Sequence, residues 1–185
     1  MNFKTLIDEE TLQRRVKELA EEIRKDYEGK DIDLICILKG SYIFTADLSR
    51  YIGINANIDF LRVSSYENNQ RKEINVMKTI IPEVEGKNVI LIEDIVDSGY
   101  TMNFLVPEIA KRKPQSIKVC TLLDKQEKRI VPFEADYIGF VISDAYVLGY
   151  GMDDNGNYRN LPYIAYKDSD KMDEKVIVKI PKRDN

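Results

Sequence analysis

Short hydrophobic runs recur along the chain, and several of them stop abruptly at polar or acidic residues. The clearest is the aliphatic run at residues 89–92, which is typical of a strand buried on both faces of a parallel sheet. Similar runs predict strands over residues 33–38, 116–123 and 137–142. Residues 57–63 alternate polar and apolar, so they predict a further strand with one wetter face.

Apolar residues at helical spacing separate these strands. Asp8 and two following acids introduce an amphipathic helix that ends near Gly29, and a second helical stretch runs to about Tyr51. Residues 102–112 predict a third helix, in which Pro107 should cause a kink or a late start. The alternation of strands and helices predicts an α/β fold, a single domain with a central, mostly parallel sheet flanked by helices.

The remaining segments are less regular. The polar stretch at residues 67–72 has no apolar anchor, which is typical of a disordered hairpin tip, and residues 73–80 resume as a partner strand. Residues 149–160 are rich in Gly, Asp and Asn and predict a loop, whereas residues 161–166 and 176–180 predict terminal strands. No role is assigned to the charged tail in which the last of these strands lies.

The length and charge of the chain limit its class. Its 185 residues suffice for one α/β domain, and no shift in composition marks a second. The net charge of −4 disfavours general nucleic-acid binding. The N-terminal residues contain no apolar signal region and no later run reaches the length of a membrane span, so we expect a cytoplasmic protein without a membrane partner.

Cysteine and histidine usage narrows the possible chemistry. Cys36 and Cys120 lie in apolar runs, where free thiols behave as small hydrophobic residues, so no disulfide is expected. Histidine is absent from the sequence. Ser-His-Asp catalysis, histidine-bound metals and histidine proton shuttles are therefore excluded, and any general base must be a carboxylate, lysine, tyrosine or cysteine.

The strongest candidate site follows the aliphatic run at residues 89–92. Three acids come first and small polar residues follow, just before a predicted helix: Glu93, Asp94, Asp97, Ser98, Gly99 and Thr101. Ligands of open α/β sheets bind beyond the carboxyl ends of the strands. A tight turn at Gly99, two hydroxyls and the N–H groups of a helix start together suit a phosphate. The acids would repel that phosphate, so they need ribose hydroxyls, Mg²⁺ or a transferable proton as partners.

Two simpler explanations of this motif fall short. A buried strand with an acidic helix cap accounts for the aliphatic run and one aspartate, but not for three acids followed by Ser-Gly-x-Thr. A dinucleotide-binding ribose acid requires an upstream Gly-x-Gly-x-x-Gly, which is missing. A second strand, loop and helix meet at Lys39-Gly40-Ser41, which indicates either an ordinary turn with a solvated lysine or a second anion site at the same edge.

The central motif supports a family assignment. A strand, Glu-Asp, two aliphatic residues and Asp-Ser-Gly-x-Thr resemble the ribose-phosphate signature of the type I phosphoribosyltransferases. From about Ile7 to Leu161, the chain resembles the hypoxanthine-guanine phosphoribosyltransferases among them. The resemblance implies one domain over residues 1–185, with a small hood from the N-terminal segment and residues from about 145 to 185. It also implies transfer of a 5-phosphoribosyl group from phosphoribosyl pyrophosphate to a 6-oxopurine, hypoxanthine or guanine, with Mg²⁺, in a homodimer or homotetramer.

The resemblance further implies roles for individual residues. The phosphoribose would bind to Glu93, Asp94, Asp97, Ser98, Gly99, Tyr100 and Thr101. Pyrophosphate would bind to Lys39, Gly40 and Arg159, beside a non-proline cis bond at Leu38–Lys39. The purine would contact Lys125, Tyr137, Ile138 and Asp144, and the metal would contact Glu93, Asp94 and Asp144. A mobile loop at about residues 64–73 would close over the reacting centre with Ser65 and Tyr66, although residues 67–72 lack the small residues common in that loop.

Three of these assignments also have a physical reason. Without histidine, Asp97 is the best general base for purine N7, although its side chain could instead cap its own loop. The ammonium group of Lys125 only donates hydrogen bonds, so it suits the O6 acceptor of a 6-oxopurine and not the amino group of adenine; the alternative is a surface lysine. Tyr137 could stack on the purine, or it could be a core residue of its strand.

Two other functions stay open at this point. One is a different type I phosphoribosyltransferase that uses xanthine, adenine or a pyrimidine base. The other is a pyrimidine-operon regulator, which uses the same fold to bind RNA and needs a basic surface with salt-dependent affinity. The net charge of −4 argues against the second.

Overall fold

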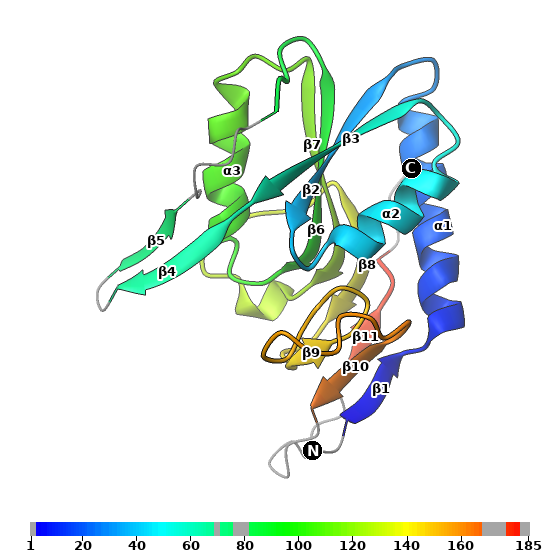
Figure 1. The fold of residues 1–185 in the computed structure, drawn as a ribbon, viewed down its shortest axis with the longest axis vertical. Coiled ribbons are helices and arrows are strands. Elements are labelled where there is room, and N and C mark those ends of the chain that lie inside the picture. Colours follow the sequence, from blue (N-terminus) through cyan, green and yellow to red (C-terminus); the bar gives the residue numbers. More distant parts are fainter. Residues whose placement is uncertain (1–2, 69–70, 76–81, 168–176, 182–185) are drawn as a thin grey trace.

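The computed structural model describes residues 3–68, 71–75, 82–167 and 177–181. Its centre is a six-stranded sheet (Figure 1). The strands are β2 (Ile32–Leu38), β3 (Ala56–Arg62), β6 (Asn88–Val96), β7 (Ser116–Asp124), β8 (Tyr137–Ile142) and β11 (Val178–Lys179). They lie in the order β11-β8-β7-β6-β2-β3, and every neighbouring pair is parallel except β11 with β8. The predicted α/β fold with a central, mostly parallel sheet is confirmed.

Helices cover both faces of this sheet. One face carries α1 (Glu9–Asp26) and α2 (Tyr42–Tyr51), and the other carries α3 (Tyr100–Ala110) (Figure 1). Successive side chains of β6 enter opposite cores, because strand residues alternate between faces. Ile90 and Ile92 belong to the core under α1 and α2, whereas Val89 and Leu91 belong to the core under α3. All four are fully buried, which explains the unbroken aliphatic run.

The starts of two helices follow from the residues that cap them. The N–H of Thr11 donates to Asp8 Oδ1 at 2.7 Å, and this hydrogen bond keeps the pKa of Asp8 below its usual value. Helix α3 begins directly after Gly99, and the N–H of Asn103 donates to the Gly99 carbonyl at 3.0 Å, which completes the first turn. Pro107 therefore lies inside the helix, near its end, and the predicted late start is wrong.

A smaller sheet lies beyond the end of the central sheet at which β2 and β6 finish (Figure 1). Its antiparallel strands, in the order β1-β10-β9, are β1 (Phe3–Ile7), β10 (Ile164–Lys167) and β9 (Val147–Leu148). The strand predicted at residues 161–166 corresponds to β10. The sequence did not indicate β1, because only Ile7 of its residues is buried and its partner strand is distant along the chain.

The polar stretch after β3 forms an antiparallel hairpin. Its strands are β4 (Ser64–Asn68) and β5 (Arg71–Asn75), so regular structure extends into the stretch predicted to lack it. Ser65 and Tyr66 lie on β4, opposite Ile74 and Glu73. The hairpin projects away from the central sheet (Figure 1). Most of the strand predicted at residues 73–80 lies outside the described residues.

The C-terminal segment supplies the last strand of the central sheet. The antiparallel pairing of β11 with β8 confirms the predicted terminal strand, and the N–H of Ser143 donates to the Ile177 carbonyl at 3.1 Å. The tail therefore covers one edge of the sheet, a role that the sequence did not indicate. Across the described ranges, none of the helices combines the length and the apolar character needed to span a bilayer.

Candidate active site

The carboxyl ends of the parallel strands finish at one level. Val96 of β6 lies beside Asp124 of β7, which lies beside Val141 of β8. The loops that follow these strands therefore share one edge of the sheet, as ligand sites of open α/β sheets do. These loops carry most of the predicted site residues.

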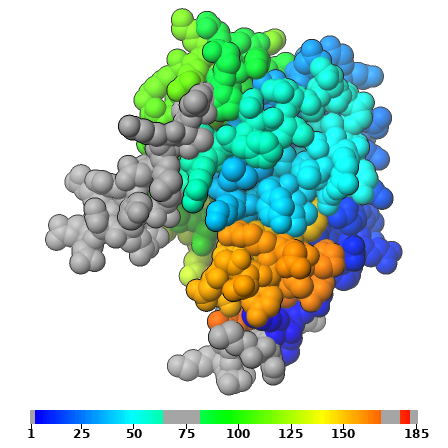
Figure 2. All heavy atoms as spheres, in the orientation of Figure 1, coloured from blue at the N-terminus to red at the C-terminus, as the bar shows by residue number. Residues whose placement is uncertain are grey.

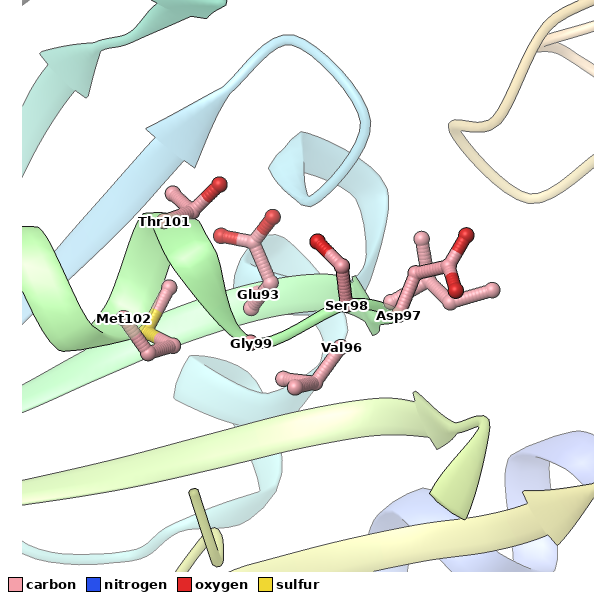
Figure 3. Close-up of a pocket in the computed structure, with 8 residues that line it drawn as sticks. Glu93, Val96, Asp97, Ser98, Gly99, Thr101 and Met102 are labelled. Atoms are coloured by element: carbon pink, nitrogen blue, oxygen red, sulfur yellow. The ribbon is translucent and has the colours of Figure 1, made fainter. Parts of the chain in front are cut away.

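The loop after β6 lines a cavity of about 80 Å³ (Figure 3). The residues around it are Glu93, Ile95, Val96, Asp97, Ser98, Gly99, Thr101 and Met102. In Figure 3 the side-chain oxygens of Glu93, Ser98 and Thr101 lie on the same side of the loop. Gly99 has φ 88°, and a Cβ there would lie 2.5 Å from the Val131 carbonyl oxygen. The residues predicted to bind a phosphate therefore line a cavity, and the turn at Gly99 accepts only glycine.

Glu93 and Asp94 form a carboxyl pair in which one oxygen has no hydrogen-bond partner among the described residues. Burial raises the pKa of Glu93 well above its usual value, and the neighbouring Asp94 adds to this effect. Burial also raises the pKa of Asp94, although the N–H of Ile95 donates to its Oδ1 at 3.0 Å. Within the described ranges, Glu93 Oε2 is buried and has no hydrogen-bond partner. An orphaned acceptor beside a second acid fits ribose hydroxyls or a hydrated cation.

The predicted pyrophosphate loop packs against this pair. The Leu38–Lys39 bond is cis, as the family resemblance implies. A Cβ on Gly40 would lie 1.5 Å from Asp94 Oδ2, and a Cβ on Gly151 would lie 1.9 Å from the Gly40 carbonyl oxygen. Only glycine permits these two approaches, so three distant segments meet at Gly40.

Arg159 lies at the same junction. Its Nη1 donates to the Gly151 carbonyl at 2.6 Å, and its Nη2 pairs with Asp153 at 2.5 Å. Its positive charge also lowers the pKa of Asp94 against the larger, raising effect of burial. The structure therefore brings Gly40, Asp94 and Arg159 together, as predicted, whereas Lys39 is exposed beside them.

Asp144 faces lysines and not the other acids. Lys128 Nζ lies 2.6 Å from Asp144 Oδ2 and Lys125 Nζ lies 3.6 Å from Oδ1. The hydrogen bond from Lys128 holds the pKa of Asp144 below its usual value. No three Asp, Glu or Cys side chains of the described part converge in a way that could hold a metal. The structure does not bring Asp144 together with Glu93 and Asp94, because β7 separates the strands that carry them, so their shared metal contact stays a prediction.

The structure places two predicted purine contacts away from the ligand edge of the sheet. Tyr137 is 1% exposed, and its hydroxyl donates to Asp26 Oδ2 at 2.7 Å. The Ile138 carbonyl accepts a hydrogen bond from Arg15 Nη2 at 2.8 Å. Both residues open β8, whereas ligands bind where the strand ends. Tyr137 is therefore a core residue, the alternative that its sequence also allowed.

Comparisons with known proteins agree with this geometry. A family model described as "Phosphoribosyl transferase domain" matches residues 4–155. The chain belongs to the phosphoribosyltransferase family. It is 44% identical to the hypoxanthine-guanine phosphoribosyltransferase of Bacillus subtilis over 164 residues, which are 88% of this chain and 91% of that protein. These matches confirm the family assigned from the central motif.

Solved structures of phosphoribosyltransferases match the fold. The crystal structure of a hypoxanthine-guanine phosphoribosyltransferase from Bacillus anthracis is 48% identical, with a TM-score of 0.85, and the match covers 89% of this chain and 98% of that chain. A hypoxanthine phosphoribosyltransferase from Staphylococcus aureus is 40% identical, with a TM-score of 0.84 over 88% and 90% of the two chains. The chain spans 25% of the bifunctional protein TilS/HprT of Listeria innocua, to which it is 45% identical.

Two residues that sequence reasoning did not single out lie close to predicted site residues. Tyr146 follows Asp144 closely and is 51% exposed, with its hydroxyl 3.1 Å from Asp154 Oδ1. Asp153 forms the ion pair with Arg159. The direction of β8 (Tyr137–Ile142) could have pointed to Tyr146. An aromatic residue that follows the end of a parallel strand lies at the ligand edge of the sheet, whereas one at the start of the strand does not.

Proposed function

We propose that this phosphoribosyltransferase transfers the 5-phosphoribosyl group of phosphoribosyl pyrophosphate to N9 of hypoxanthine or guanine and releases pyrophosphate. One observation carries the proposal: the phosphate-sized cradle at Ser98, Gly99 and Thr101 adjoins a carboxyl pair with an unpartnered oxygen. A ribose 5-phosphate has an anion at one end and hydroxyl donors at the other, so it complements both features.

The carboxyl pair would hold the sugar. Glu93 and Asp94 accept hydrogen bonds from the ribose hydroxyls, which satisfies the buried Oε2 of Glu93. They would also hold Mg²⁺ with the help of substrate oxygens, since the protein alone does not gather three acidic ligands in its described part. The bound Mg²⁺ would neutralise charge that develops on the leaving pyrophosphate.

The pyrophosphate would lie over the junction at Gly40. The absence of side chains at Gly40 and Gly151 leaves main-chain groups accessible there, and Lys39 and Arg159 supply positive charge. These groups stabilise the leaving anion while the anomeric carbon becomes cation-like. The predicted closing role of Ser65 and Tyr66 stays a prediction, because their side chains lie outside the described part.

Base selection would depend on Lys125. Its side chain is 9% exposed, so an ammonium that met the amino group of adenine would leave buried donors unpaired. Such a mismatch costs about 1–3 kcal/mol. Tyr146 is the exposed aromatic residue near Asp144 and would stack on the purine in place of Tyr137.

A panel of bases tests the proposal. Hypoxanthine, guanine, xanthine, adenine and uracil are each supplied with phosphoribosyl pyrophosphate and Mg²⁺, and nucleotide formation is measured. We expect turnover with hypoxanthine and guanine, and adenine turnover lower by roughly 10-fold or more. Turnover with uracil or adenine in preference to both 6-oxopurines would overturn the proposal. Sedimentation analysis of the same sample checks the predicted homodimer or homotetramer.

A further inference from the structure

Arg129 lies behind the phosphate loop and not in its cavity. Its side chain is 12% exposed, and its guanidinium pairs with Asp124, whose side chain is 2% exposed. A second donor of the guanidinium bonds to the main-chain carbonyl of Asp97. Arg129 borders a separate cavity with Asp124 and Phe133, and it does not line the one formed by Ser98 and its neighbours.

Main-chain N–H groups of residues 125–131 bind the carbonyls of the two residues on either side of Asp97. The N–H groups of Ile130 and Val131 both donate to the Ser98 carbonyl at 3.0 Å. The N–H of Lys125 donates to the Val96 carbonyl at 2.9 Å. Three successive carbonyls, those of residues 96, 97 and 98, therefore face residues 125–131. Only the middle one is held by a side chain.

The direction of these carbonyls sets the direction of the N–H groups. The C=O and N–H of a planar trans peptide point to opposite sides, and the one cis bond of the described part is Leu38–Lys39. When the carbonyls of Asp97 and Ser98 face the Arg129 segment, the N–H groups of Ser98 and Gly99 face away from it. These are the groups that would donate to a bound phosphate.

Arg129 is unlike an arginine that binds a phosphate directly, because an acid already neutralises its charge. Asp124 Oδ1 pairs with the guanidinium, and Asp124 Oδ2 accepts a hydrogen bond from Gln126 Nε2 at 3.1 Å. The loop also packs closely on the arginine, since a Cβ on Gly99 would lie 3.0 Å from Arg129 Cδ. Arg129 therefore acts on the loop backbone.

We propose that Arg129, held by Asp124, is a positioning residue that orients the Ser98 and Gly99 N–H groups toward the 5′-phosphate of the bound nucleotide. This inference rests on the proposed phosphate-binding role of the loop. The segment after β7 would then serve both base selection, through Lys125, and phosphate binding, through Arg129. These two residues are four positions apart, and both donate hydrogen bonds to carbonyls at the start of the phosphate loop.

The test compares two ligands that differ only in the phosphate. Binding of inosine 5′-monophosphate is measured by titration calorimetry, and binding of inosine by ligand-observed NMR, for the wild type and for Arg129→Gln and Arg129→Lys. We expect Arg129→Gln to weaken the nucleotide by about 10-fold or more and to change the nucleoside by less than about twofold. Arg129→Lys should fall between, because one ammonium cannot replace a fork that reaches two acceptors.

Two further variants complete the design. Lys87→Gln removes an ion pair with Asp33 at the opposite edge of the sheet and should leave both affinities unchanged. Asp124→Asn frees the guanidinium without removing it, so it should lower nucleotide affinity in the same selective way. If Arg129→Gln does not fold, Asp124→Asn and Arg129→Lys carry the test.

The outcomes separate the inference from the proposed function. Equal losses for nucleotide and nucleoside in the Arg129 and Asp124 variants, or no loss in either, would overturn the positioning role. A wild type that binds the nucleotide no more tightly than the nucleoside would instead remove the phosphate assignment of Ser98, Gly99 and Thr101. A selective nucleotide loss in the folded variants supports both.

Discussion

Asp97 is exposed, and its side chain lines the cavity beside the phosphate loop while its carbonyl bonds to Arg129. An exposed carboxylate at this point can take the proton that the purine releases, and no histidine competes for this role. The carbonyl contact is independent of the carboxyl group. Changing the side chain should therefore affect proton transfer and leave the loop in place.

Asp97→Asn should lower kcat by ~10²-fold or more, while the affinity for inosine 5′-monophosphate stays close to that of the wild type. Steady-state kinetics and nucleotide titration check both parts. Asp136→Asn is the control, because Asp136 pairs with Lys118 at the opposite ends of the strands and should not change kcat. An Asp97→Asn enzyme with wild-type turnover would show that another group takes the proton.

Glu93→Gln should raise the melting temperature at about pH 8 by on the order of 2–4 °C and lower activity. Burial raises the pKa of Glu93, so the acid is neutral in both states at low pH and adds no penalty there. As the pH rises from the unfolded-state pKa to the raised folded-state pKa, the unfolded chain ionises while the native state resists ionisation, and stability falls until the folded-state pKa is passed. Glutamine does not ionise, so the variant does not lose stability in this way as the pH rises.

Melting curves of Glu93→Gln and the wild type between about pH 4 and 8 measure the difference. It should shrink toward the acidic end, where both proteins carry an uncharged group. A variant that is less stable at every pH would mean that Glu93 already has a compensating partner in the native state.

At the scale of elements, the loop after β9 is tied to the helices. The hydroxyl of Tyr150 donates to Asp47 Oδ2 on α2 at 2.6 Å, and Gln13 of α1 donates to the same oxygen at 2.9 Å. The segment after Leu148 packs directly against α2 (Figure 2, orange on cyan). The same loop continues to Arg159, so this contact positions the predicted pyrophosphate residues relative to Gly40.

Tyr150→Phe should destabilise the protein by about 1–3 kcal/mol and raise KM for phosphoribosyl pyrophosphate more than KM for the purine. The aromatic ring is kept, but the hydrogen bond from the Tyr150 hydroxyl to Asp47 is lost, and with it this link between the loop and α2. Urea unfolding and substrate kinetics measure the two effects. Tyr51→Phe is the matched control, since its exposed hydroxyl donates to Gln13 at 3.2 Å. A parallel rise in both KM values would argue against a loop-specific effect.

At the scale of the whole molecule, the C-terminal segment closes the sheet. Without β11, the unpaired edge of β8 would face solvent, and exposed strand edges promote association between chains. Val178 also packs against the core under α1 and α2. The tail therefore protects the sheet at the end opposite β3.

A chain that stops after Lys167 should unfold at lower urea concentration and scatter more light on concentration than the full chain. A chain that stops after Pro181 keeps β11 and serves as the control. Equal stability of the two shortened chains would show that β11 adds nothing to the sheet.

Much of the site is predictable because its residues are contiguous. The aliphatic run before Glu93 identifies a doubly buried strand, and the sequence through Thr101 combines acids, hydroxyls and a glycine at the point where that strand ends. Local chemistry and strand direction suffice to predict that these residues gather in one polar loop there. They do not suffice for Asp144, whose lysine partners follow from strand order, or for Tyr137, whose place at the start of β8 puts it among core residues.

The sequence by itself determined the α/β class, the alternation of buried strands and the polar loop after β6, because each depends on neighbours within a few residues along the chain. Only the tertiary structure decided which distant groups meet: Gly151 on Gly40, Tyr150 on Asp47, and Arg129 on the carbonyl of Asp97. Such contacts depend on strand order and loop path, and periodicity of the sequence records neither.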